Sequence, residues 1–166
     1  KIKDYALEMG AKTKYSALEA AKGMEELIKA GLSLEQIMGG GLEDALNLAT
    51  AGELDLAEAA EIMSTAVNSF NEEGLKTKDA ANILAGTANA SATDVHELRY
   101  ALASSAAVAG LAGQKFKDTA TALGIFAQNG LKGSDAGTSL KSMMMNLVPK
   151  TAEAFELFEQ FGLFTL

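Results

Sequence analysis

The regular interruption of helical apolar patterns by glycine is the feature that most constrains the fold of this chain. Apolar residues recur every three or four positions, as on one face of an α-helix, in stretches such as 18–28 and 56–70. The clearest helix start is Ser16 followed by Glu19, a capping box in which each side chain bonds the other's backbone. Stops are found at Gly31, Gly52, Gly74, Gly113, Gly130 and Gly133. With 16 glycines and no sustained heptads, the chain cannot form one continuous rod.

Composition also indicates an all-α fold. Valine occurs only four times and tryptophan is absent, whereas alanine and leucine are abundant, and this mixture favours helices over strands. We predict an all-α compact bundle of about eight or nine short helices joined by Gly-rich turns. The predicted helices lie near residues 2–10, 17–30, 34–38 (little more than a turn), 42–51, 56–72, 78–90, 94–112, 117–129, 134–147 and 151–161.

The domain prediction is a helical core over residues 1–148 and a connecting helix over residues 149–166. Pro149 marks the division, because proline ends or kinks the helix before it. The chain starts at Lys1 without a basic and apolar leader, and it ends in an apolar run. We interpret the sequence as a piece of a longer protein, in which the connecting helix leads toward a C-terminal region.

A weak internal repeat appears when the chain is shifted by about 60 residues, which aligns Glu19 with Asp79, among other pairs. The alignment predicts two duplicated units, residues 16–75 and 76–135, whose helices would share a core. Alanine-rich helices also align by chance, so the duplication and the chance match both stay open.

Charge and cysteine content exclude several function classes. The net charge is −8, and an acidic surface repels phosphate backbones, so direct nucleic-acid binding is not expected. The absence of cysteine excludes disulfides, thiolate metal sites and thiol nucleophiles in this chain. The longest uncharged stretch, from Tyr100 to Gln114, falls short of the roughly 20 apolar residues of a membrane span. We interpret it as a packed internal helix.

His96 is the one histidine, and Asp94 and Glu97 lie beside it. A metal site or an acid–base pair needs ligands that face one another, and neighbouring positions on a helix do not. A solvent-exposed or helix-capping role is therefore the prediction for His96. The run from Gly39 to Gly41 lacks the Gly-Lys-Ser or Gly-Lys-Thr ending of a phosphate loop, so we predict an interhelical turn there.

Pairs of acidic residues are the remaining candidates for catalysis, since glycoside hydrolysis uses two carboxylates at a set separation. The chain has three tyrosines and no tryptophan to line a sugar groove. We therefore predict solvated charge and no enzyme, and we assign no catalytic, cofactor-binding or metal-binding residue and no cofactor. The pairs are Glu25–Glu26, Glu43–Asp44 and Glu72–Glu73.

Two apolar series are candidates for packing or for contact with partners. Met143, Met144 and Met145 follow one another, and methionine adapts to irregular surfaces. On a helix at most two of them can enter one core, and buried packing is the favoured prediction over a partner surface. A second series at three-residue spacing would pack on the domain or promote oligomers. It consists of Phe155, Phe158, Phe161 and Phe164.

The segment from Asn129 to Met143 is the most specific motif. It combines a helix end at Asn129-Gly130, a turn at Gly133 and a new helix that starts with a Ser134 cap. It resembles the signature of phage tail tape measure proteins, in which a Gly-hydrophobic-Lys-Gly turn leads into Ala-Gly-Thr and a helix. The order and spacing of short sequence motifs elsewhere is also similar to that family, over roughly residues 8 to 148.

The resemblance implies a structural protein of a phage or prophage tail. Members of the family look like helical rulers that set tail length during assembly, and they are thought to leave the tail or line a passage when DNA is ejected. The implied partners are copies of the chain itself, tail tube subunits and tail-tip or assembly proteins, with a location in the virion tail and, during assembly, in the host cytoplasm. Gly130, Gly133, Gly137 and Thr138 match the motif, and their evident role is turn and packing geometry.

Physics limits what this segment can be within a ruler, because a ruler should rise as a long uninterrupted helix. We expect these residues to form a folded domain that works in assembly. Two alternatives stay open from the sequence: a membrane-interacting channel or DNA-ejection module built around Tyr100 to Gln114, and a generic helical interaction scaffold.

Overall fold

The fold is all-α, as predicted. The computed structural model describes residues 1–149 and 151–162, and it contains helices but no strand within those ranges. In this described part of the chain, nine of the helices are nine residues or longer. The α-helices are α1 Ile2–Lys12, α2 Ala17–Lys29, α3 Leu34–Gln36, α4 Leu42–Ala51, α5 Leu56–Ser69, α6 Thr77–Ala90, α7 Val95–Leu111, α8 Phe116–Gln128, α9 Gly133–Leu147 and α10 Ala152–Gln160.

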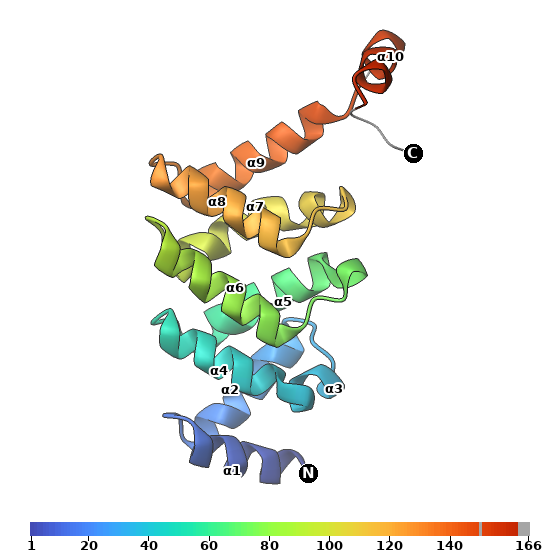
Figure 1. The fold of residues 1–166 in the computed structure, drawn as a ribbon. Coiled ribbons are helices and arrows are strands. Elements are labelled where there is room, and N and C mark those ends of the chain that lie inside the picture. The colour runs from blue at the N-terminus through green and yellow to red at the C-terminus, as the bar shows by residue number, and fades with distance from the viewer. Residues whose placement is uncertain (150, 163–166) are drawn as a thin grey trace.

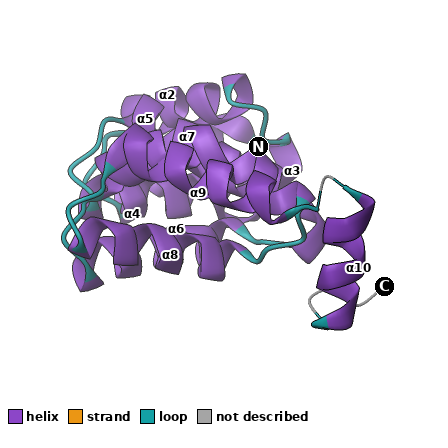
Figure 2. Cartoon of the chain, turned by 90° about the horizontal axis from the view of Figure 1, so that it is seen from above, coloured by secondary structure: helices purple, strands orange, loops and turns teal. Residues whose placement is uncertain are grey.

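The helices form a stack of antiparallel hairpins in two layers. Helices α2, α5, α7 and α9 lie side by side in one layer, and α4, α6 and α8 lie in the other (Figure 2). Each of the hairpins α4–α5, α6–α7 and α8–α9 places one helix in each layer. Helix α1 closes the N-terminal end against α2, and α10 lies beyond the other end (Figure 1). The apolar faces of neighbouring hairpins thus bury one another along a continuous core.

Side-chain caps set where the helices of the first layer begin. Ser16, Asp55 and Asp94 each accept a hydrogen bond from the backbone N–H three residues on, at the starts of α2, α5 and α7. The three caps are evenly spaced, and α9 begins at Gly133 after a nearly equal interval. The hairpin, of about 40 residues, is therefore the structural repeat of the stack. Its spacing is shorter than the offset of the sequence alignment, and the duplication of residues 16–75 in 76–135 stays a prediction.

Two phenylalanines and one carboxylate tie alternate hairpins together. Phe70, just after α5, meets Phe116, at the start of α8, edge to face with ring centroids 5.2 Å apart. Both rings are buried. The Glu73 carboxylate accepts the backbone N–H of Phe116 at 3.1 Å, and so caps the first turn of α8 from a distant turn of the chain. The interhairpin turn after α5 therefore also fixes the entry to the hairpin α8–α9.

Most helix boundaries agree with the predictions to within two residues. The predicted Ser134 cap is wrong, because α9 already begins at Gly133 and no described side chain caps it. Two further segments differ. The helix predicted over 56–72 ends at Ser69, and a 3-10 turn, Asn71–Glu73, follows it. The turn predicted at the three glycines is an irregular π-type segment, Ile37–Gly41, joining α3 to α4. Its Gly40 has a φ of 121°, a conformation that favours glycine.

The stretch from Tyr100 to Gln114 falls mostly in α7, and one face of that helix is buried in the core. This confirms the prediction of a packed internal helix. Across residues 1–149 and 151–162, no helix has both the length and the apolar character needed to cross a membrane. The buried positions of this stretch are Ala101, Leu102, Ser105, Ala106 and Ala109.

The C-terminal helix is set apart from the stack. Helix α10 falls within the predicted connecting segment, and none of its residues is buried in the described part of the chain. The division into a core over 1–148 and a connecting helix over 149–166 stays a prediction, and Lys150 and residues 163–166 lie outside the described residues.

The edge-to-face pair gives a direct test of how the hairpins are coupled. We expect Phe70→Ala to lower the free energy of unfolding by about 3–5 kcal/mol, because it leaves a cavity against Phe116. Urea denaturation followed by circular dichroism measures the change. The matched control is Phe161→Ala, whose ring is 71% exposed and whose removal should cost less than about 0.5 kcal/mol. Equal effects of the two substitutions would contradict the packing described here.

Candidate functional site

The segment that resembles the tape measure signature forms the turn between α8 and α9. Gly130 has a φ of 85°, and the Leu131 N–H returns to the Phe126 carbonyl at 2.9 Å, which closes the end of α8. Gly133, the first residue of α9, has a φ of 55°. Both positions lie in the left-handed region, where a side chain is strained, so the glycines of this turn are required by its backbone.

Beyond the turn, the segment brings α9 against α7 with no side chain between them. Gly137 is buried, and a Cβ added there would overlap the carbonyl oxygen of Ala101. Ala136 and Leu140 flank this contact and are also buried. The small residues of the signature thus allow two helix backbones to touch, whereas ordinary helix pairs keep their axes about 8–10 Å apart.

The same device recurs in the neighbouring pair of helices. A Cβ added to Gly110 of α7 would overlap the carbonyl oxygen of Ser69 at the end of α5. Glycines therefore hold the layer α5–α7–α9 together at two successive interfaces. Thr138, the remaining matched residue of the signature, is exposed and takes no part in the core.

A polar cluster joins α5 to α7 on the surface of the stack. Arg99 donates from Nη1 to Glu61 Oε2 at 2.6 Å, and its Nη2 lies 3.1 Å from Glu58 Oε1. His96 Nδ1 lies 2.9 Å from the same Glu58 oxygen. The Arg99 guanidinium stacks 4.4 Å over the ring of Tyr100. The ion pairs of this cluster therefore link α5 to α7.

The sequence predicted a solvent-exposed or helix-capping role for His96, and this geometry agrees with it in part. The prediction missed Arg99, which makes more contacts in the cluster than His96 does. The His96 side chain is 45% exposed, while Asp94 rather than His96 caps α7. Arg99 is the one arginine beside 13 lysines, and arginine suits a fork of two carboxylates better than lysine does. A single arginine among so many lysines was therefore the signal in the sequence that could have pointed to this ion-pair cluster. Elsewhere too, the described residues bring no three His, Asp or Glu side chains together as a metal site would need.

Comparison with known proteins decides the family. The sequence model of the family described as "Phage-related minor tail protein" matches residues 3–165. The chain belongs to this family. It is 32% identical over 98% of its length to a protein named "Tape measure protein" from Pneumococcus phage Dp-1. It is 27% identical over 99% of its length to a "Probable tape measure protein" from Escherichia phage P2.

These relatives are much longer than the chain, which spans 14% of the first and 20% of the second. No solved structure matches this minor tail protein sequence.

In this minor tail protein segment, two of the candidate catalytic carboxylates link separate helices. Glu73 caps α8, as described above. Asp44 accepts a hydrogen bond from the Thr77 hydroxyl at 2.6 Å, which links α4 to α6. Burial raises the pKa of the Asp44 carboxyl, and the Thr77 hydrogen bond acts in the opposite direction. Glu25 and Glu26 both pair with Lys29 on the surface of α2, at 2.8 and 3.1 Å.

The glycine run also has a packing role. Gly41 is buried, and a Cβ added there would lie 2.8 Å from the carbonyl oxygen of Gln36. Gly39 and Gly40 line a hollow that they share with Glu43 and Asp44. With Glu35 and Asp79 also in the lining, four carboxylates outnumber Lys76 and Lys78 and make the hollow unfavourable for a phosphate.

The two apolar series remain largely on the surface. Met144 packs partly against the core, whereas Met143 and Met145 are 46% and 51% exposed, so the favoured prediction of buried packing holds for one of the three. Phe158 is half-buried, and Phe155 and Phe161 are exposed. Phe164 lies outside the described residues.

The backbone contact of α7 and α9 predicts opposite effects for two glycine substitutions. Gly137→Ala forces the helices apart, and we expect it to lower the free energy of unfolding by about 1–3 kcal/mol. Gly86→Ala is the matched control, because a Cβ on this α6 glycine meets no described atom within 4 Å. It should raise stability by up to about 1 kcal/mol through helix propensity. Urea denaturation measures both, and a stabilising Gly137→Ala would refute the close contact.

Proposed function

We propose that this chain is a folded segment of a tape measure protein. The whole protein takes part in tail assembly and in setting tail length, and this segment serves assembly. The observation that carries the proposal is the match to two tape measure proteins along nearly the whole chain. The location that follows is the virion tail, reached from the host cytoplasm during assembly.

The hairpin stack suggests how this segment differs from the length-setting part of such a protein. A continuous α-helix rises about 1.5 Å per residue, so the roughly 40 residues of one hairpin interval would span about 60 Å. The same residues folded as a hairpin add only one helix diameter along the stack, about 10 Å. The segment is therefore poorly suited to measuring length and well suited to presenting a folded surface.

That surface suits contacts with other tail components, and the proposed partners are copies of the chain, tail tube subunits and tail-tip or assembly proteins. The exposed Met143 and Met145 at the end of α9 supply adaptable apolar area for such contacts. A non-enzymatic role agrees with the use of Glu73 and Asp44 as ties between helices.

The rival interpretation as a membrane-interacting module has less support. Its proposed core, the stretch from Tyr100 to Gln114, contributes its small apolar residues to the contacts of α7 with α5 and α9. Insertion of that helix in a membrane would break the central layer of the stack.

Tail length in deletion phages tests the proposal. We expect an in-frame deletion of about 40 residues, the length of one hairpin interval, to shorten the tail by about 60 Å when it removes part of a long helix of the protein outside this segment. Deletion of residues 76–114, one whole hairpin interval, is the matched control of the same length. It should either block tail assembly or leave tail length within about 10 Å of normal.

Electron microscopy of purified particles measures both lengths. Normal tails from both deletions would overturn the role in length determination. Equal shortening by the full helical rise, about 60 Å, would show that this segment acts as an extended ruler and not as a folded part.

A further inference from the structure

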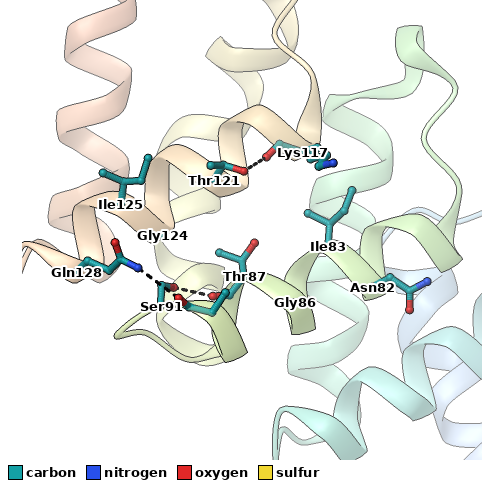
Figure 3. A pocket seen from close by; sticks show the side chains of 11 residues that line it. Asn82, Ile83, Gly86, Thr87, Ser91, Lys117, Thr121, Gly124, Ile125 and Gln128 are labelled. Atoms are coloured by element: carbon teal, nitrogen blue, oxygen red, sulfur yellow. Dashed lines mark hydrogen bonds between the residues drawn. The ribbon is translucent and has the colours of Figure 1, made fainter.

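The layer of α4, α6 and α8 contains a groove that the rest of the fold leaves open. A hollow of about 440 Å³ lies between α6 and α8 (Figure 3). Ile83 and Ile125 stand on its two sides, and Gly86 and Gly124 keep its floor low. The side-chain amide of Gln128 donates to the Ala90 carbonyl at 3.2 Å, which joins the ends of the two helices.

The groove follows from the glycine contacts in the opposite layer. Backbone contact draws α7 and α9 together in one layer, whereas α6 and α8 touch much less closely in the other. Two layers of unequal spacing leave free space on the wider side. Ile125, which lines the hollow, is 52% exposed there.

The chemistry of the groove favours an acidic amphipathic helix. Its lining is mostly apolar or uncharged, with Lys117 on the rim. Among the described residues that line it, none carries a carboxylate. Such a surface matches a helix that has an apolar stripe beside negative charge.

Helix α10 has these properties. Leu157 is 50% exposed, and Phe161, four positions on and just after the helix end, is 71% exposed, so the two lie on one face. The helix carries Glu153, Glu156 and Glu159 and no basic residue. Its nine residues span about 14 Å, close to the roughly 12 Å of α6 between Asn82 and Ala90.

We propose that α10 of one copy docks in the α6–α8 groove of a second copy. In the structure α10 lies beyond α9 and away from the groove of its own chain (Figure 1), so the two surfaces are both open. The contact joins different surfaces of the two copies, so it builds rings or open chains of copies, or a two-fold pair when two copies exchange α10 with each other. A single short helix makes a small interface, so association is weak and rises with concentration.

Complementation between two variants is the decisive experiment. Leu157→Ala with Phe161→Ala removes the docking helix's apolar stripe and leaves the groove intact. Gly86→Leu fills the groove with a side chain that meets no described atom at its Cβ, and it leaves α10 intact. Each variant alone should stay monomeric over a concentration series in sedimentation velocity, while an equimolar mixture should form a heterodimer.

Three controls separate this contact from general hydrophobic association. Leu111→Ala removes an apolar side chain that is 90% exposed at the end of α7, and it should leave self-association of the chain unchanged. Lys117→Glu should weaken self-association at least tenfold at low salt, because it opposes the acidic helix. Circular dichroism confirms that each variant keeps its helical content.

Three outcomes would overturn the proposal. The first is an unmodified chain that stays monomeric at every concentration. The second is self-association that survives both Gly86→Leu and the double alanine substitution, which would place the contact on another surface. The third is an absence of heterodimer in the mixture, including the case in which α10 closes on the groove of its own chain.

Discussion

The backbone contact between α7 and α9 is the interaction on which the rest of the structure depends. It exists because Gly137 has no side chain to keep the Ala101 carbonyl at a distance. Gly110 repeats the arrangement between α7 and the end of α5. One layer of the stack is thereby drawn tight, and the opposite layer opens between α6 and α8. The tight layer and the groove are consequences of the same few small residues.

Local structure was predictable from the sequence, because helix caps and apolar spacing act within a few residues. Ser16 was identified as a cap with its Glu19 partner, and most helix boundaries agree closely with the prediction. The even spacing of the hairpins was present in the sequence as the three cap residues Ser16, Asp55 and Asp94. The abundant alanines also align at other offsets, and they obscured this repeat of about 40 residues.

Long-range packing was not predictable in the same way. No local pattern states that Gly137 meets Ala101, or that Glu73 caps a helix 43 residues away. The groove is an emergent property of the unequal layers, and its residues have no motif. The partners of Arg99 were hidden for the same reason, since Glu58 and Glu61 lie on a different helix. What the sequence did indicate was the role of the signature glycines as turn and packing residues.

In a minor tail protein, a hairpin stack presents a folded surface but spans little length, whereas one long helix would span length. A stack of hairpins gains little length per residue, and in the proposed tape measure role its value is surface. Part of that surface lies at the C-terminal end of the described residues, where Met143 and Met145 on α9 and the acidic helix α10 are exposed. Hydrogen exchange of the chain tests most directly whether the glycine contact organises the stack. The amides of α7 and of α9 up to Leu140 should exchange most slowly, through global unfolding only, and those of α10 much faster. If α9 exchanged as fast as α10 while α7 stayed protected, α9 would not be held against α7 and the account would be wrong.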